Sequence, residues 1–100
     1  MEISDIPISE WQPITNKHDL AVLGKLGEEA SELCSAICRC IIQGMDGLEP
    51  TTGKPNRQWL EEEIADVMAL VTLAIQEFNL DSAAISERCS RKIAYKFIWI

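Results

Sequence analysis

The sequence lacks the features that send a protein into or across a membrane. No stretch approaches the roughly 18 continuous apolar residues that a membrane-spanning helix needs. The first residues, Met1–Asp5, carry neither the basic region nor the apolar run of a secretory signal peptide. We therefore expect a soluble cytoplasmic protein that has no membrane partner.

Basic residues are scarce. The chain has 9 Lys and Arg against 16 Asp and Glu, which gives a formal net charge of −7. A surface with this balance argues against nucleic-acid binding, because a nucleic-acid partner needs a concentration of positive charge. It does not argue against a nucleotide, whose phosphates arrive together with a metal ion.

Cysteine pairs of the kind that bind zinc are also missing. Cys34, Cys38, Cys40 and Cys89 form no C-x-x-C pair, and three of them fall on one predicted helix. We interpret the four as buried free thiols in a reducing compartment. The single histidine, His18, stands near a predicted helix start, where a capping or surface role is more common than catalysis.

The sequence does contain three long helical patterns, and 47% of its residues are apolar. The patterns predict helices at 16–43, 57–78 and 82–96, preceded by an irregular arm at 1–15. The predicted class is therefore all-α, with one domain at 16–100. Expected caps are Thr15 or Asn16, Asn56 and Asp81 at the helix starts, and Gly44 at the end of the first helix.

A short chain buries a limited core, so we expect oligomerisation to complete it. The second helix is apolar almost all round after Asp66, which favours an interface in a homodimer or homotetramer. Gly24 and Gly27 suggest close packing against another backbone. The expected core stripe of the first helix is made of Leu26, Ala30, Leu33, Ile37 and Ile41. The apolar residues of the arm, Ile6, Ile8, Trp11 and Ile14, are expected to lie on the body, and the apolar tail 97–100 to pack on a neighbouring subunit.

The second helix carries acids on a face that is otherwise apolar. Glu62, Glu63 and Asp66 fall within about 100° of arc on a helix. Trp59, Leu70 and Leu73 lie on the same arc. Carboxylates on a face headed for burial are costly unless they are paired or bound to a cation.

The first helix repeats this spacing in Glu28-Glu29-Ala30-Ser31-Glu32. Two such faces can meet across a helical bundle, where the acids would repel one another without cations. Carboxylate oxygens are the ligands that Mg²⁺ and Mn²⁺ prefer. The alternative is two solvated acidic faces on a helical protein-interaction module.

Glu28-Glu29-x-x-Glu32 followed by Glu63-x-x-Asp66 resembles the signature of the MazG-like all-α nucleoside triphosphate pyrophosphohydrolases. The flanking segments 25–27 and 64–67 are similar as well, and the resemblance covers roughly residues 18–80. It implies a MazG-like helical bundle and Mg²⁺-dependent hydrolysis of a nucleoside triphosphate, such as a dNTP or a modified NTP, to monophosphate and pyrophosphate. The interval between Glu32 and Glu63 is slightly longer than is usual in that family, and the Gly/Pro-rich segment 44–57 occupies it.

The resemblance implies roles for individual residues. Glu29, Glu32, Glu63 and Asp66 are the expected metal ligands, Glu28 or Glu29 the expected general base, and Glu62 a supporting residue. Lys92 and Lys96, in the last helix, are expected to reach the substrate phosphates.

The residues themselves suggest further phosphate contacts. Lys25 stands one turn before the first acids, where it either neutralises them or reaches a phosphate. Lys54 and Arg57, just before the second acidic helix, are the loop candidates for phosphate contact. Base recognition would fall to Trp11, Trp59 or Asn79. A catalytically silent nucleotide-binding module and a dUTP or house-cleaning diphosphatase remain alternatives.

Overall fold

The computed structural model describes residues 10–99, except the side chains at 97 and 99, and these residues form four helices. They are α1 (Lys17–Gln43), α2 (Asn56–Glu77), α3 (Ser82–Ala94) and the short α4 (Lys96–Trp99). The described part of the chain has no strand beyond one isolated bridge between Leu48 and Pro55. The all-α prediction is confirmed. The predicted third helix is divided, because α3 ends at Ala94 and a new turn begins at Lys96.

The ends of α1 follow the predicted caps. The side-chain oxygen of Asn16 accepts hydrogen bonds from the backbone N–H groups of His18 and Asp19, at 2.9 and 3.1 Å. At the other end Gly44 has φ of 84°, and its N–H donates to the carbonyl of Cys40 at 2.8 Å. Glycine adopts this left-handed conformation without a steric penalty, so it suits the position after a helix.

The start of α2 differs from the prediction that Asn56 is its N-cap. Pro55 holds the N-cap position, and Asn56 is the first helical residue. Asn56 is fully buried, and its Nδ2 donates to the carbonyl of Gly44 at 3.0 Å and to Oε1 of Gln43 at 3.3 Å. The prediction was wrong because this amide joins the start of α2 to the end of α1.

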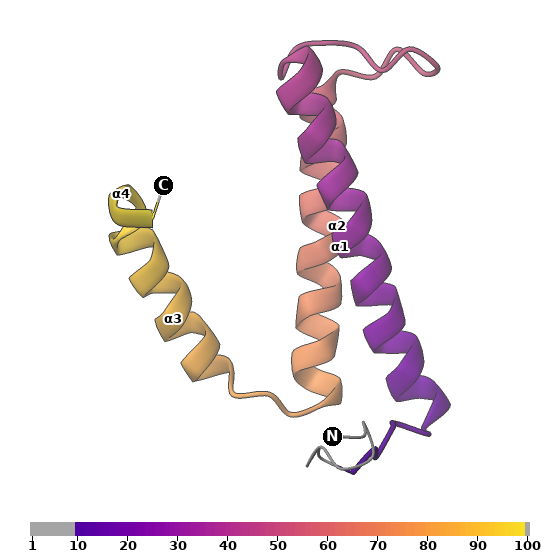
Figure 1. Cartoon of the computed structure of the whole chain (residues 1–100), viewed down its shortest axis with the longest axis vertical. Coiled ribbons are helices and arrows are strands. Elements are labelled where there is room, and N and C mark those ends of the chain that lie inside the picture. The colour runs from indigo at the N-terminus through magenta and orange to yellow at the C-terminus, as the bar shows by residue number, and fades with distance from the viewer. Residues whose placement is uncertain (1–9, 100) are drawn as a thin grey trace, which may run out of the picture.

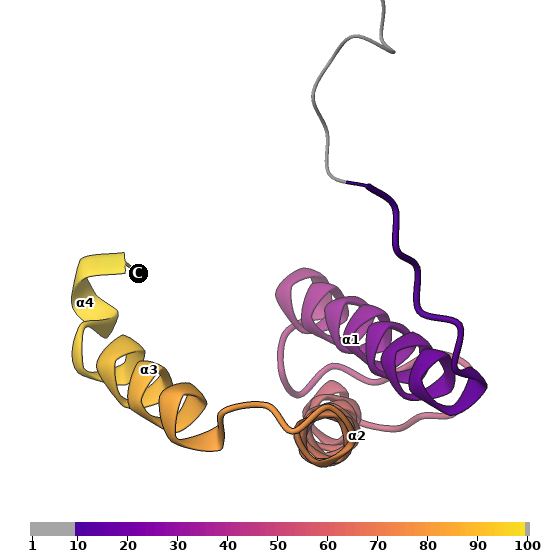
Figure 2. The same ribbon diagram turned by 90° about the horizontal axis from the view of Figure 1, so that it is seen from below.

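The helices α1 and α2 form a hairpin and lie side by side over most of their length (Figures 1 and 2). One set of their buried and half-buried positions follows alternating intervals of four and three residues, which is the spacing of a coiled-coil seam. On α1 these positions are Val22, Leu26, Glu29, Leu33, Ala36 and Cys40. On α2 they are Asn56, Leu60, Glu63, Val67, Leu70, Ala74 and Glu77. Each helix therefore places a glutamate, Glu29 or Glu63, inside the seam.

This seam corrects the predicted core stripe of α1. Leu26 and Leu33 lie in it, but Ala30, Ile37 and Ile41 are exposed. The predicted stripe was drawn opposite the acids, whereas Glu29 itself faces α2, so the true seam is rotated by one residue at three positions. Within residues 10–99 of the single chain there is no close packing at the glycines, since a Cβ added at Gly24 or Gly27 meets no atom within 4 Å.

The helix α3 stands apart from the α1–α2 hairpin (Figure 1). Asp81 caps it as predicted, accepting a hydrogen bond from the N–H of Ala84 at 2.9 Å. The radius of gyration is 18.5 Å, against about 13 Å for a compact domain of this length. Among the described apolar residues only Ala36 and Ala74 are buried. The isolated chain therefore has almost no core of its own.

Several predicted burials are wrong for the chain as described. Cys34, Cys38 and Cys89 are exposed and Cys40 is half-buried, although all four are free thiols as predicted. Cys40 lies in the seam between α1 and α2, whereas Cys34 and Cys38 lie outside it. Trp11 and Ile14 are exposed rather than packed on the body, and the predictions for Ile6 and Ile8 lie outside the described residues. None of the described helices combines the length and apolarity needed to span a membrane.

Candidate metal centre

Two buried carboxylates face each other across the hairpin. Glu29 of α1 is 7% exposed and Glu63 of α2 is 8% exposed. In each, Oε2 is buried and finds no hydrogen-bond partner among the described residues. A buried carboxylate oxygen without a partner costs free energy, so this arrangement calls for a cation between the helices.

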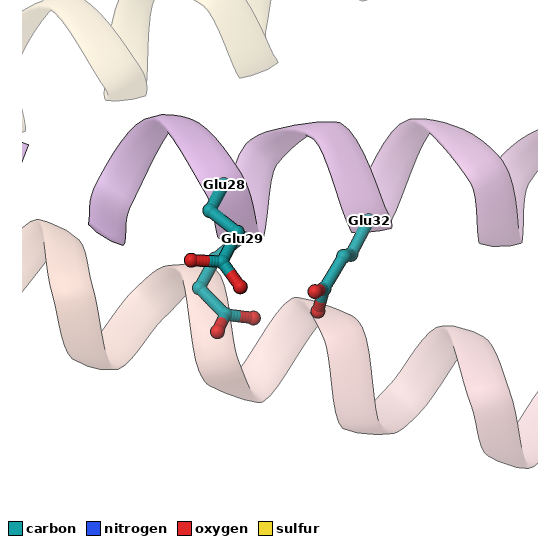
Figure 3. Close-up of side chains that lie close together, drawn as sticks. All are labelled: Glu28, Glu29 and Glu32. Atoms are coloured by element: carbon teal, nitrogen blue, oxygen red, sulfur yellow. The ribbon is translucent and has the colours of Figure 1, made fainter. Parts of the chain in front are cut away.

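Exposed acids extend this pair into two groups of three carboxylates that share Glu29. One group is Glu28, Glu29 and Glu32, and the other is Glu29, Glu63 and Asp66. Within each group, one oxygen from every residue lies within 4.8 Å of the others. Figure 3 shows the first group extending from α1 toward α2. The structure thus brings together the five acids of the two sequence motifs, which we call the carboxylate cluster.

The electrostatics of the carboxylate cluster indicate a shortage of positive charge. Burial raises the pKa of Glu63 above its ordinary value, and the charges of Asp66 and Glu29 raise it further. The neighbouring charge of Glu29 is the main cause that raises the pKa of Glu32, followed by partial desolvation. Mutual repulsion of this kind falls when a divalent cation binds.

Lys25 provides one positive charge at the edge of the cluster. Its Nζ lies 3.3 Å from Oε1 of Glu28 and 3.1 Å from Oε1 of Glu29. The pKa of Lys25 is raised by its hydrogen bonds to these two carboxylates, first Glu29 and then Glu28. Neutralising these acids is one of the two roles predicted for Lys25, and one ammonium group leaves most of the cluster's charge uncompensated.

Lys54 and Glu62 form a separate pair on the loop side of α2. The Nζ of Lys54 is 2.7 Å from Oε2 of Glu62 and 4.1 Å from the ring centre of Trp59. The hydrogen bond from Lys54 lowers the pKa of Glu62. Glu62 belongs to neither group of three carboxylates, so it acts here as the partner of Lys54.

The other predicted phosphate contacts are not gathered at the cluster. Arg57 pairs with Asp46 at 3.3 Å, and both side chains are exposed. Lys92 and Lys96 belong to α3 and α4, which stand apart from the hairpin in Figure 1. Trp11 is 85% exposed and lies before α1.

A pocket beside the cluster contains residues that sequence reasoning missed, namely Ser35, Arg39 and Glu49. Arg39 follows Glu32 by seven residues, which is about two helical turns. That interval places both side chains on one face of α1, and it was the signal available in the sequence. Glu49 lies in the loop after α1, and no spacing in the sequence pointed to its position.

The donor set suits a hard divalent cation. All five side chains offer carboxylate oxygens, which Mg²⁺ and Mn²⁺ prefer, and none offers the sulfur or imidazole ligands typical of zinc. The two buried oxygens without partners fit a cation as well. The residues present therefore match a magnesium-type site.

Comparison with known proteins gives one finding on the family. The sequence model of the phosphoribosyl-ATP pyrophosphohydrolase family matches residues 2–92, which is most of the chain. No curated protein and no solved structure gives a significant match. The matched region includes both acidic motifs and the pocket beside them.

Proposed function

Because the chain belongs to the phosphoribosyl-ATP pyrophosphohydrolase family, within the MazG-like all-α pyrophosphohydrolase superfamily, we propose that it hydrolyses a nucleoside triphosphate to monophosphate and pyrophosphate. The proposed reaction depends on Mg²⁺, with Mn²⁺ as a substitute. The substrate class includes phosphoribosyl-ATP, dNTPs and modified NTPs, all of which present a triphosphate.

The observation that supports this proposal best is the pair of buried oxygens on Glu29 and Glu63 that have no hydrogen-bond partner within residues 10–99. A protein that used these acids for solubility alone would leave them in water, where they cost nothing. Their burial opposite each other, beside three exposed carboxylates, supports a site that binds cations and admits phosphate from solvent.

We assign the residues as follows. Glu29, Glu32, Glu63 and Asp66 hold Mg²⁺, which when bound polarises the phosphoryl group and lowers the pKa of a water molecule. Glu28 is exposed and belongs to one group of carboxylates only, whereas Glu29 is shared between both. Glu28 is therefore the better choice for the general base that takes the proton of the attacking water.

The positive charges have proposed roles at the phosphates. Lys25 adjoins Glu28 and Glu29, and we propose that it binds a phosphate oxygen of the substrate. Contacts from Lys54, Arg57, Lys92 and Lys96 are part of the same proposal. We also propose that the protein is a cytoplasmic homo-oligomer, and that each chain consists of an arm at 1–15 and one domain at 16–100.

The test is pyrophosphate release from a panel of nucleoside triphosphates, with and without Mg²⁺. We expect Mg²⁺-dependent release by the wild type. Glu63→Gln is expected to lower kcat/KM by about a hundredfold or more, because loss of a ligand leaves the metal poorly held. Glu61→Gln is the matched control, since Glu61 is exposed on the same helix and lies outside both groups.

Two results would count against the enzyme. One is a wild type that releases no pyrophosphate from any nucleotide in the panel. The other is a Glu63→Gln variant that is as active as Glu61→Gln. Mg²⁺ binding without turnover would instead favour a catalytically silent nucleotide-binding module.

A further inference from the structure

A pocket opens directly beside the carboxylate cluster, between α1, α2 and the loop that joins them. It encloses about 430 Å³ and is lined mainly by Glu32, Ser35, Arg39, Glu49, Trp59 and Glu63. Two of these residues, Glu32 and Glu63, also belong to the cluster. A ligand whose phosphate chain binds at the cluster therefore extends into this pocket. The volume of the pocket lies within the range of small-ligand sites.

Arg39 contributes a positive charge to the lining of the pocket. It is half-buried, and it makes no hydrogen bond, ion pair or ring contact with the described residues. Three carboxylates share the pocket with it, namely Glu32, Glu49 and Glu63. A guanidinium without a partner in a partly enclosed site is well suited to a phosphate, which it can bind through two parallel hydrogen bonds.

Glu49 does not compete for Arg39. Its carboxylate accepts hydrogen bonds from the hydroxyl and N–H of Thr52, at 2.7 and 2.6 Å, and from the N–H of Thr51 at 3.1 Å. These contacts, with the Thr52 hydroxyl first, lower the pKa of Glu49 to about 2. Glu49 is therefore engaged in shaping its own loop, which leaves Arg39 available to a ligand.

Trp59 supplies the aromatic surface of the pocket. The ammonium of Lys54 lies over its ring, 4.1 Å from the centre. This contact and the link from Lys54 to Glu62 restrain the indole at the wall of the pocket. An aromatic wall beside a phosphate-binding cation is a recurring arrangement for nucleotides, because every base offers a face for stacking.

We propose that this pocket is the nucleotide subsite, in which Arg39 binds a phosphate of the substrate and Trp59 contacts its base. The inference rests on the proposed function for the placement of the triphosphate at the cluster. It adds that recognition of the base occurs at Trp59 rather than at Trp11 or Asn79. A nucleoside triphosphate is thereby distinguished from an inorganic polyphosphate.

The test measures binding and does not need turnover. α,β-Methylene ATP resists cleavage between its first two phosphates, and tripolyphosphate has no base. Binding of each is measured by calorimetry with Mg²⁺ on the wild type, Arg39→Gln and Trp59→Leu, after circular dichroism shows that each variant is helical. Lys17→Gln and Trp11→Leu are matched controls, because both residues are exposed at or before the start of α1.

The two substitutions are expected to have different signatures. Arg39→Gln weakens both ligands by about tenfold or more, the loss expected for one charge-assisted hydrogen bond. Trp59→Leu weakens α,β-methylene ATP by about tenfold but leaves tripolyphosphate unchanged, because stacking involves only the base. Trp59→Phe keeps an aromatic ring and most of the affinity, and both controls bind like the wild type.

The failures of the two proposals are distinguishable. If the wild type releases pyrophosphate while Arg39→Gln and Trp59→Leu bind the analogue normally, the subsite is overturned and the enzyme stands. If the variants lose binding as described but no nucleotide is hydrolysed, the subsite stands and the proposed activity falls. Weakening by Trp11→Leu without weakening by Trp59→Leu, or a wild type that does not bind the analogue, also overturns the subsite.

Discussion

At the scale of single residues, the burial of the Glu29 and Glu63 carboxylates opposes folding. Both occupy seam positions that apolar side chains would normally fill, and in both one oxygen has no hydrogen-bond partner in the described part of the chain. Burial raises the pKa of Glu63 first, and Asp66 and Glu29 raise it further. The charged form of the residue therefore works against folding, and a cation reverses that effect.

The pH dependence of stability follows from this sign. A carboxyl whose pKa is higher in the folded state binds more protons when folded, so its contribution to stability falls as pH rises through the raised pKa. Without metal, Glu63→Gln is expected to raise Tm at pH 7 by a few degrees and to have little effect near pH 4. Thermal melts from pH 4 to 7, in a chelator, compare the variant with the Glu61→Gln control.

Addition of Mg²⁺ is expected to make the Tm of the wild type and of Glu61→Gln higher than the Tm of Glu63→Gln. Wild type and Glu61→Gln gain Tm when Mg²⁺ is added at pH 7, since binding to the folded state stabilises it. Glu63→Gln gains much less. A wild type whose Tm is unchanged by millimolar Mg²⁺ would contradict the metal site.

At the scale of elements, the α1–α2 hairpin is held in register at its loop end by Asn56. This residue is fully buried and joins the start of α2 to Gly44 and Gln43 at the end of α1. The loop carries Lys54 and Glu49 to the cluster side of the hairpin, where Lys54 pairs with Glu62. The geometry of the site therefore depends on how this end is closed.

Removal of the Asn56 amide should loosen that end. Asn56→Ala leaves the carbonyl of Gly44 without this donor inside the protein, which costs about 1–3 kcal/mol. The expected result is a lower urea midpoint and faster amide exchange at the loop end of the hairpin. Gln58→Ala, on the exposed face of the same helix turn, serves as the control. Equal stability of the two variants would show that the link contributes nothing.

At the scale of the whole molecule, we propose that the described chain is one subunit of a homo-oligomer. The α1–α2 seam buries few apolar residues, and α3 lies away from it (Figure 2). Large apolar side chains remain exposed on both helices, including Ile42 at 79% and Met68 at 65%. Exposed apolar surface of this kind is typical of an interface between subunits.

Oligomerisation has a direct test. Sedimentation of the wild type is expected to give a multiple of the 11.2 kDa chain mass. Met68→Glu places a charge on the exposed apolar side of α2 and is expected to shift the measured mass toward that of the monomer. The Kd for dissociation of the subunits is expected to rise at least tenfold, which corresponds to about 1.4 kcal/mol. Gln58→Glu adds the same charge to the same helix as a control, and a monomeric wild type would refute the assembly.

The local pattern of residues determined the helices and the existence of two acidic faces. Capping at Asn16 and Asp81, the glycine at 44 and the spacing of the acids depend on neighbours within one turn, so the sequence was sufficient to predict them. The same locality explains the confirmed all-α class. Helical spacing also placed Glu28, Glu29 and Glu32 on one face and Glu62, Glu63 and Asp66 on another, whereas the resemblance to the family signature selected Glu63 and Asp66 from the second set.

Tertiary structure decided which way each helix turns about its axis. A one-residue rotation of α1 moves Glu29 into the seam and Ile37 out of it, and the sequence pattern allowed both arrangements. The tertiary structure also pairs Glu62 with Lys54 of the loop, and Arg39 lines a pocket in which it has no partner among residues 10–99. Helical periodicity specifies the angles between side chains around one helix. Only contact with a second helix determines which of those side chains face the interior.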